Sequence, residues 1–293
     1  MSPLYDEAVA ETVLVSVAEL GRIIEELRPT LLDVRYRLGG VDGREEYLRG
    51  HLPGASYVDL ETELAAPPGP RGRHPLPEPD RFQDAMRRRG VSTGRPVVVY
   101  DAVAGASAAR CWWLLRYFGH RDVRVLDGGY PRWAAEGGPV ATGEVETERG
   151  DFTARPGQMP VLDADGAARV ARTGVLVDAR AAERFRGDVE PIDPVAGHIP
   201  GAVNLPYPQN LEPGAGPAAR FRSRDELAAL YGTVGVEPGT DREVGVYCGS
   251  GVTAVHDVLA LARIGVPAAL YPGSWSEWVT DPQRPVGCTS SPD

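Results

Sequence analysis

The sequence GHLPGA at residues 50–55 returns as GHIPGA at residues 197–202, an offset of 147 residues. Three further blocks recur in the same order at almost the same spacing: LLDVR and LVDAR begin at residues 31 and 176, VVVY and VGVY at 97 and 244, and LDGGYPRW and LYPGSWSEW at 126 and 270. A repeat of this length is the size of a domain rather than of a solenoid unit. The sequence therefore predicts two similar domains that arose by tandem duplication.

Domain limits follow from this repeat. A chain of 293 residues has room for one or two domains. We predict a first domain over residues 1–140, a linker over residues 141–160 and a second domain over residues 161–293. The linker lies in a stretch that is rich in glycine, proline and charge and has no helical or strand periodicity, which is typical of a connecting segment.

Within each copy, short apolar runs alternate with helical stretches. Strands are expected at residues 97–100, 175–178 and 244–247, and helices at residues 106–118, 224–232 and 252–265. Apolar residues run continuously in the expected strands, which indicates burial on both faces. The alternation predicts an α/β fold in which each domain is a mostly parallel sheet flanked by helices. The functional crevice of such a sheet lies at the carboxyl ends of its strands.

The composition excludes several classes of protein. With 42% hydrophobic and 25% charged residues, the chain is typical of a soluble globular protein, and no apolar run approaches the length of a membrane helix. A net charge of −10 argues against a nucleic-acid partner. The first ten residues carry Asp6 and Glu7 and no basic segment before an apolar stretch, so we expect no secretory signal.

The three cysteines are too few and too scattered for a disulfide framework or a cysteine-rich zinc site. We therefore expect a cytoplasmic protein without a metal site. Cys111 stands beside two tryptophans in the middle of an expected helix and is expected to be a small buried apolar residue. Cys288 lies in a tail rich in proline and serine and is expected to be an incidental exposed thiol.

Cys248 differs from both, because it stands at the carboxyl end of an expected strand with a helix directly after it. The loop CGSGVTA covers residues 248–254. Its two glycines allow the chain to curl tightly with backbone N–H groups pointing inward. Such a curl at a helix N-terminus is a cradle for an anion, and it favours the thiolate form of a cysteine. The sequence predicts a nucleophilic Cys248 whose adduct is held by Gly249, Gly251, Val252 and Thr253.

A phosphatase also places a cysteine at a strand end before an anion-binding loop. Phosphatases of this kind end the loop with an arginine that binds phosphate, and the matching residue here is Ala254. The sequence therefore argues against phosphatase chemistry.

These motifs together resemble the two-domain sulfurtransferases of the rhodanese family. The CGSGVTA loop is similar to that of 3-mercaptopyruvate sulfurtransferases, whereas thiosulfate-preferring relatives often carry arginine and lysine after the cysteine. Further marks of the family are the GHIPGA turn, the segment from DAR to RFRG at residues 178–187, and GSWSEW at residues 273–278. The resemblance covers nearly the whole chain and implies tandem rhodanese-like domains.

The resemblance also implies a reaction. Cys248 would take a sulfane sulfur from a small anionic donor as a persulfide and pass it to a thiol, thioredoxin or cyanide. No metal or organic cofactor is implied, because the cysteine itself carries the sulfur.

The two copies are expected to differ in function. By the repeat register, Asp101 takes in the first domain the place that Cys248 has in the second. The sequence after Asp101, DAVAGASAAR at residues 101–110, lacks the paired glycines, so no curled cradle is expected there. The first domain is predicted to lack the nucleophile and to form one wall of the site, as the resemblance also implies.

Arg184 is expected to bind the negative group of the donor, because a guanidinium matches a planar carboxylate. The mercaptopyruvate enzymes that this chain resembles carry a second arginine further along, and the matching position here is Asp193. Arg186 could compensate for that loss.

Protonation of a pyruvate enolate needs a proton relay, which the resemblance assigns to a serine, a histidine and an acid. Ser250 matches the serine and His74 the histidine, while the acid position falls on Glu61, where the family pattern has aspartate.

Other polar and aromatic residues of the motifs are expected to be structural. His51 and His198 occupy equivalent turns in an active and an inactive copy, so we expect each imidazole to bond to nearby backbone. Trp275 and Trp278 are expected in the core or the pocket wall.

The sequence leaves the identity of the sulfur donor open. The loop favours 3-mercaptopyruvate, whereas Asp193 and Glu61 favour thiosulfate. A second alternative is a sulfur carrier or regulatory module without free turnover, whose persulfide passes to a dedicated protein partner.

Overall fold

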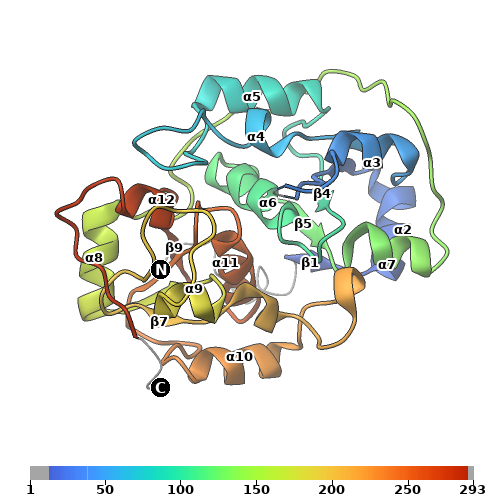
Figure 1. Cartoon of the computed structure of the whole chain (residues 1–293). Helices are drawn as coiled ribbons and strands as arrows, with labels where there is room; N and C mark the ends of the chain where they lie inside the picture. Colours follow the sequence, from blue (N-terminus) through green and yellow to red (C-terminus); the bar gives the residue numbers. More distant parts are fainter. Residues whose placement is uncertain (1–12, 38, 290–293) are drawn as a thin grey trace.

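The first half of the chain forms a five-stranded parallel sheet in the computed structural model, which describes residues 13–37 and 39–289. The sheet order is β1-β5-β4-β2-β3, and Figure 1 labels β1, β5 and β4 of this sheet. Its strands are β1 (Leu14–Val15), β2 (Thr30–Asp33), β3 (Ser56–Tyr57), β4 (Val97–Tyr100) and β5 (Val123–Leu126). The accompanying helices are α2 (Val17–Leu27), α3 (Gly43–Arg49), α4 (Leu60–Glu63), α5 (Pro79–Arg88), α6 (Ala108–Tyr117) and α7 (Gly129–Ala135).

The second half forms a four-stranded parallel sheet in the order β7-β6-β8-β9. Its strands are β6 (Val175–Asp178), β7 (Val203–Asn204), β8 (Val244–Tyr247) and β9 (Ala269–Leu270). Its helices are α8 (Ala164–Thr173), α9 (Ala182–Arg186), α10 (Arg224–Gly232), α11 (Ala254–Arg263) and α12 (Ser274–Trp278), with 3-10 turns η2 (Tyr207–Asn210) and η3 (Gly216–Ala218).

The predicted α/β architecture is confirmed. All four residues of β4, β6 and β8 are buried, because helices cover both faces of these central strands. Helices α6 and α11 begin a little later than the sequence pattern indicates, because the residues ahead of them form the loops described below. The expectation about the first ten residues lies outside the described part of the chain.

The repeated sequence blocks form one hydrogen-bonded unit in each sheet. In the second domain Arg180 pairs with Asp178 and donates to the carbonyl of Gly197 at 2.6 Å. The hydroxyl of Tyr247 accepts from the N–H of Ile199 at 3.1 Å. The first domain has the same contacts among Asp33, Arg35, Gly50, Leu52 and Tyr100. These blocks recur because together they attach the turn at residues 50–55 or 197–202 to the end of the central strands.

The two motif histidines are structural, as predicted. Nδ1 of His51 lies 2.9 Å from the carbonyl of Tyr47, and Nδ1 of His198 lies 2.8 Å from the carbonyl of Phe185. Each imidazole also stacks on the ring of that same residue. Both histidines are buried within their own domain. Their contacts stabilise the turn, and neither belongs to the site.

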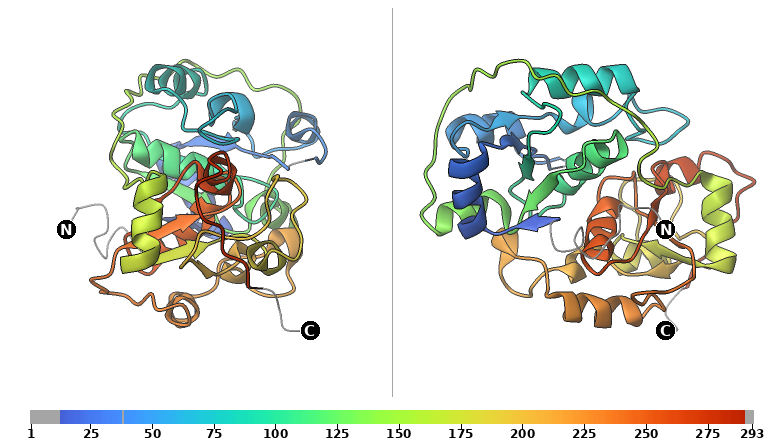
Figure 2. Two further views of the ribbon diagram at one scale, coloured as in Figure 1. Left: turned by 60° about the vertical axis from the view of Figure 1, so that its left-hand side comes forward. Right: turned by 180° about the vertical axis from the view of Figure 1, so that it is seen from behind.

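The segment between α7 and α8 runs around the outside of the first domain (Figure 2). The N–H groups of Gly150 and Phe152 donate to the carbonyls of Arg87 and Val91. Phe152 is buried against Phe82 in the core of the first domain. The part of the chain predicted as a linker is thus a strap that packs on the first domain. The domain limits given above stay a prediction.

A hydrophobic core cluster spans the two domains. Helix α6 follows β4, helix α11 follows β8, and the two helices pack against each other across the domain boundary. Trp112 and Leu115 of α6 and Val258 and Leu261 of α11 all belong to this core. The loops that precede the two helices therefore face the same space. Among the described residues no helix is long and apolar enough to cross a bilayer.

Candidate active site

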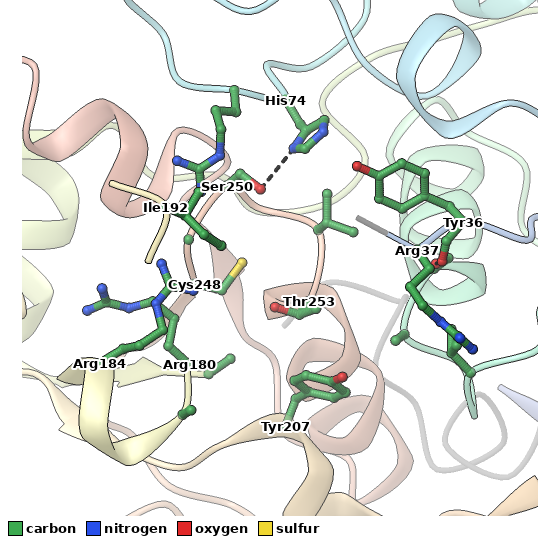
Figure 3. Close-up of a pocket in the computed structure, with 18 residues that line it drawn as sticks. Tyr36, Arg37, His74, Arg180, Arg184, Ile192, Tyr207, Cys248, Ser250 and Thr253 are labelled. Carbon is green, nitrogen blue, oxygen red and sulfur yellow. Dashed lines mark hydrogen bonds between the residues drawn. The ribbon is translucent and has the colours of Figure 1, made fainter. Parts of the chain in front are cut away.

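A pocket of roughly 540 Å³ lies between the two domains at the carboxyl ends of β4 and β8 (Figure 3). The first domain contributes Tyr36, Arg37, Arg73, His74, Val103, Ala106 and Ser107. The second contributes Ala179, Arg180, Ala181, Arg184, Ile192, Tyr207, Cys248, Gly249, Ser250, Val252 and Thr253. The pocket thus brings together most of the residues that the sequence assigned to the site.

Cys248 follows β8 directly and is only 1% exposed. Its N–H donates to Ser274 Oγ at 3.1 Å, and its carbonyl accepts from the N–H of Trp275 at 3.0 Å. Ser274 has φ of 53°, a left-handed conformation that is rare outside glycine and costs energy. The GSWSEW segment therefore holds the backbone of the cysteine in place.

The loop after Cys248 curls as predicted. The N–H of Gly251 points back at the thiol and lies 3.2 Å from Sγ. Gly251 has φ of 76°, and a Cβ placed on it would lie 2.3 Å from the carbonyl oxygen of Pro272. Only glycine fits this position. The resulting loop presents backbone N–H groups ahead of the N-terminus of α11, which favours an anion at the sulfur.

The loop of the first domain also curls, contrary to the expectation from its missing glycine pair. The Asp101 carboxylate accepts hydrogen bonds at 2.8–2.9 Å from the N–H groups of Val103, Gly105, Ser107 and Ala108. Ala104 adopts φ of 55° without being glycine. Four hydrogen bonds to one carboxylate offset that strain. The first domain therefore has its own anion cradle, which its own aspartate fills.

Ser250 and His74 lie together, although they come from different domains. Ser250 Oγ and His74 Nδ1 are 2.8 Å apart (Figure 3). Burial and the nearby cations Arg110 and Arg73 lower the pKa of His74 to about 4. The imidazole is therefore neutral at physiological pH, and one of its nitrogens is free to accept a proton.

Glu61 does not join this pair. Its carboxylate is exposed and accepts a hydrogen bond from the hydroxyl of Tyr36 at 3.2 Å. In the described part of the chain no hydrogen bond connects it to His74. The geometry does not support Glu61 as the acid of the relay, because its carboxylate bonds to Tyr36 and does not line the pocket.

Arg184 lines the pocket as expected, and its guanidinium is held by two carboxylates. It donates to Glu190 at 2.7 and 3.0 Å and to Asp193 at 3.2 Å. Arg186 does not line the pocket; it is half-buried and pairs with Asp188. The structure therefore gives no support to Arg186 as the substitute for the missing arginine.

The remaining motif residues lie where the sequence places them. Trp275 and Trp278 are buried and donate through their indole nitrogens to backbone carbonyls. Cys111 is fully buried on α6, and burial raises the pKa of its thiol. Cys288 is exposed. No group of side chains suited to binding a metal ion occurs among the described residues.

Several residues in and around the site were missed by sequence reasoning, among them Arg73, which lines the pocket, and Arg110 and Ser274, which support its loops. Arg110 is fully buried on α6 and donates to carbonyls of both domains, including those of His74 and Gly251 at 3.0 Å. Nothing in a helix pattern marks such an arginine, since its partners are backbone atoms far along the chain. Arg73 stands next to His74 and could have been noticed for that reason.

The chain matches known proteins along nearly all of its length. The family model for the Rhodanese-like domain matches residues 16–136 and 163–281. A Mycobacterium tuberculosis protein named "Putative thiosulfate sulfurtransferase SseB" is 48% identical over 282 residues, which cover 94% of this chain and 96% of that protein. The 3-mercaptopyruvate sulfurtransferase of Escherichia coli is 36% identical over 286 residues, covering 95% and 99% of the two chains.

The crystal structure of SseA from Escherichia coli, described as a 3-mercaptopyruvate sulfotransferase with the rhodanese fold, superposes with a TM-score of 0.79. At 36% identity it covers 91% of this chain and 100% of its own. The double match of the family model and these close relatives agree with the duplicated sheets and the curled cysteine loop. This chain belongs to the rhodanese family and carries two Rhodanese-like domains in tandem.

Proposed function

We propose that this chain is a sulfurtransferase that moves a sulfur atom from 3-mercaptopyruvate to a thiol or cyanide through a persulfide on Cys248. The observation that carries the choice of donor is the 2.8 Å contact of Ser250 Oγ with His74 Nδ1 in the same pocket as the thiol. A hydroxyl and a neutral imidazole can relay a proton to an enolate, a step that mercaptopyruvate needs and thiosulfate does not.

In the first half-reaction the Cys248 thiolate attacks the sulfur of the donor. A new S–S bond forms, the donor C–S bond breaks, and its electron pair passes to pyruvate enolate. The proton of the donor thiol moves through Ser250 to His74 and returns to the enolate carbon. The products are pyruvate and a Cys248 persulfide anion, so no oxidant or added proton is needed.

The loop serves both forms of the cysteine. The Gly251 N–H lies 3.2 Å from Sγ in the free thiol, and the loop continues into the N-terminus of α11. Preorganised N–H donors of this kind stabilise an anion without further rearrangement. Because burial and the nearby arginines lower the pKa of His74 to about 4, its imidazolium gives the proton back readily.

In the second half-reaction an acceptor takes the outer sulfur. Cyanide forms thiocyanate as the S–S bond breaks, and the electron pair returns to Cys248 as thiolate. A thiol such as that of thioredoxin does the same in a cell. We place the protein in the cytoplasm, because a reactive cysteine and two other free cysteines are compatible with a reducing setting.

Thiosulfate is the second candidate donor. Asp193 pairs with Arg184 and so occupies part of the guanidinium group that would bind the carboxylate of 3-mercaptopyruvate. The Mycobacterium tuberculosis relative also bears a thiosulfate name. Thiosulfate requires no proton relay, so variants of Ser250 and His74 would leave its transfer nearly unchanged.

The test is the intact mass of the reduced protein after brief exposure to each donor, with Cys248→Ser as the control. Gain of one sulfur atom from 3-mercaptopyruvate, absent in the control and slowed in His74→Gln and Ser250→Ala, is the expected result. Gain from thiosulfate alone would make thiosulfate the donor. Gain from neither would contradict a free-standing enzyme and leave a partner-fed sulfur carrier.

A further inference from the structure

His256 lies in the first turn of α11, directly behind the loop of the nucleophile, and neither half-reaction uses it. The residue is fully buried and does not line the pocket. Nε2 of its ring lies 3.1 Å from the carbonyl oxygen of Ala104 in the first domain. A carbonyl oxygen only accepts a hydrogen bond, so Nε2 carries the proton and donates it across the domain boundary.

Asn210 fixes this tautomer from the other side of the ring. Its side-chain nitrogen lies 3.1 Å from His256 Nδ1 and donates to Asp257 Oδ1 at 2.7 Å. Nδ1 therefore accepts, which agrees with a proton on Nε2. Burial lowers the pKa of His256 to about 4, so the ring is neutral at physiological pH. The ring also stacks on Phe221, with ring centroids 4.4 Å apart, and this packing fixes its orientation.

The Ala104 carbonyl belongs to the strained part of the first-domain loop. Ala104 has φ of 55°, and Val103 and Ser107 of the same loop line the pocket. Ser107 Oγ in turn donates to the carbonyl of Tyr36 at 3.1 Å, and Tyr36 also lines the pocket. His256 therefore holds the first-domain wall of the pocket through the backbone of Ala104.

Asn210 holds a part of the second-domain wall. It ends the 3-10 turn η2, whose first residue, Tyr207, lines the pocket. The Tyr207 ring also makes an edge contact with the His256 ring, with centroids 5.3 Å apart. Together His256 and Asn210 connect the helix behind Cys248 with walls that come from both domains.

The geometry of sulfur transfer determines which molecule meets these walls. An acceptor attacks the outer sulfur of the persulfide in line with the S–S bond, from the side opposite Cys248 Sγ. A bond forms between the acceptor and the outer sulfur, the S–S bond breaks, and its electron pair returns to Cys248 as thiolate. Figure 3 shows the Cys248 sulfur pointing into the middle of the pocket, with Arg184 on one side and Tyr36 on the other.

We propose that His256 and Asn210 are positioning residues for the acceptor side of the pocket, and that the walls they hold favour acceptors whose thiol is carried on a carbon skeleton. This inference rests on the proposed function and adds a determinant of acceptor specificity to it. The skeleton of a thiol acceptor contacts Tyr36, Tyr207 and the first-domain loop. Diatomic cyanide reaches the outer sulfur without these contacts. Loss of the walls therefore slows a thiol and leaves cyanide unchanged.

The decisive variant is His256→Phe, which keeps a stacked ring and removes the hydrogen bond to Ala104. Its Cys248 is first loaded as the persulfide with inorganic polysulfide, then mixed with cyanide or with dithiothreitol, a neutral dithiol. Loss of the wall contacts predicts a second-order rate constant about 10-fold lower for dithiothreitol and an unchanged one for cyanide. His256→Gln, whose amide N–H can still donate to the carbonyl, should restore part of the dithiothreitol rate.

His51→Phe is the matched control. His51 is also buried, contacts the Tyr47 carbonyl and stacks on the Tyr47 ring, but it does not line the pocket. This variant should lower thermal stability and leave both acceptor rate constants as in the wild type. An equal loss of rate with both acceptors in His256→Phe, or no loss with either, would overturn the inference.

Tyr207→Ala tests the same wall without removing a hydrogen bond of the buried network, so it decides the question even where His256→Phe does not fold. The ratio of the dithiothreitol to the cyanide rate constant should fall in this variant as well. A ratio equal to that of the wild type would mean that the wall does not select the acceptor. Because polysulfide loads Cys248 without either proposed donor, failure of the donor step contradicts the proposed function alone.

Discussion

At the scale of single residues, Gly251 decides whether the thiol faces an anion cradle. Gly251→Ala puts a Cβ 2.3 Å from the carbonyl oxygen of Pro272, so the loop must shift and the N–H bond to Cys248 is lost. We expect persulfide formation to slow about 100-fold, as when one donor of an oxyanion hole is removed. Stopped-flow measurement of pyruvate release checks this expectation.

Gly265→Ala is the matched control for that variant. Gly265 has nearly the same φ, 75°, but a Cβ there meets no atom within 4 Å. It should cost about 1 kcal/mol of stability through backbone strain alone and leave the rate of persulfide formation unchanged. Equal losses in both variants would mean that general destabilisation, not the cradle, governs the rate.

The protonation state of His74 gives a second prediction at this scale. Its pKa is lowered from 6.5 to about 4, chiefly by burial and further by Arg110 and Arg73. Above pH 5 the folded protein should therefore hold neutral imidazole, whereas an unfolded chain becomes protonated as the pH falls through 6.5. The NMR signal of the His74 ring, assigned with His74→Gln, should not titrate between pH 5.5 and 8. A midpoint near 6.5 would contradict the buried relay.

At the scale of elements, the loop that carries Arg73 and His74 depends on close backbone packing against the start of α12. Gly72→Ala would place a Cβ 2.7 Å from the Gly273 carbonyl oxygen and 2.9 Å from Ser276 Oγ. The loop must then move away from the second domain and carry both side chains with it. A displacement of about 1 Å can lower a rate 100-fold, so kcat/KM for the donor should fall by at least about 10-fold.

Gly69→Ala controls for changes elsewhere in the same turn. Gly69 and Gly72 exchange two backbone hydrogen bonds, but a Cβ on Gly69 meets nothing within 4 Å. Its activity should equal that of the wild type. If Gly72→Ala is also unaffected, the loop is not held by this contact.

Elements built from local pattern could be predicted from the sequence, and contacts between distant elements could not. The strands β4 and β8 are continuous apolar runs, and the repeated blocks form one hydrogen-bonded unit, so the duplication predicted two parallel sheets. The Arg73–Asp193 contact joins residues 120 positions apart in different domains. No periodicity marks such a pair.

The places where the structure differs from expectation have physical causes of the same kind. Family register placed Glu61 at the relay, but the carboxylate bonds to Tyr36 instead. Missing glycines argued against a curl after Asp101, yet four hydrogen bonds to its carboxylate hold Ala104 in a left-handed conformation. In both places a side-chain hydrogen bond that the sequence pattern does not reveal determines the result. At Glu61 it sets the partner of the carboxylate, and after Asp101 it sets the backbone conformation.

At the scale of the whole molecule, Arg110 connects the two domains. Its guanidinium is fully buried and donates to the carbonyls of Leu64, His74 and Pro75 in the first domain and of Gly251 in the second. Burial lowers its pKa to about 10, while the charge of Cys248 opposes that shift, so it remains a cation at neutral pH. One residue of α6 thereby supports the histidine loop, the cysteine loop and the charge of the site.

Arg110→Met would remove this donor from the carbonyls of Leu64, His74 and Gly251, while the Pro75 carbonyl keeps the N–H of Ala66. We expect the free energy of unfolding to fall by about 2–4 kcal/mol, and the rate of persulfide formation per folded molecule to fall as well. Urea unfolding followed by fluorescence, together with single-turnover kinetics in the absence of urea, measures the two effects separately. Arg87→Met is the control, because Arg87 donates at 2.7 Å to the carbonyl of Phe152 in the strap on the first domain, and neither residue lines the pocket. It should lose stability and keep its rate. If Arg110→Met also keeps its rate, the domain contact stabilises the fold without shaping the site, and other contacts, such as those of Arg73, Ser250 and Ser276, hold the two loops in position.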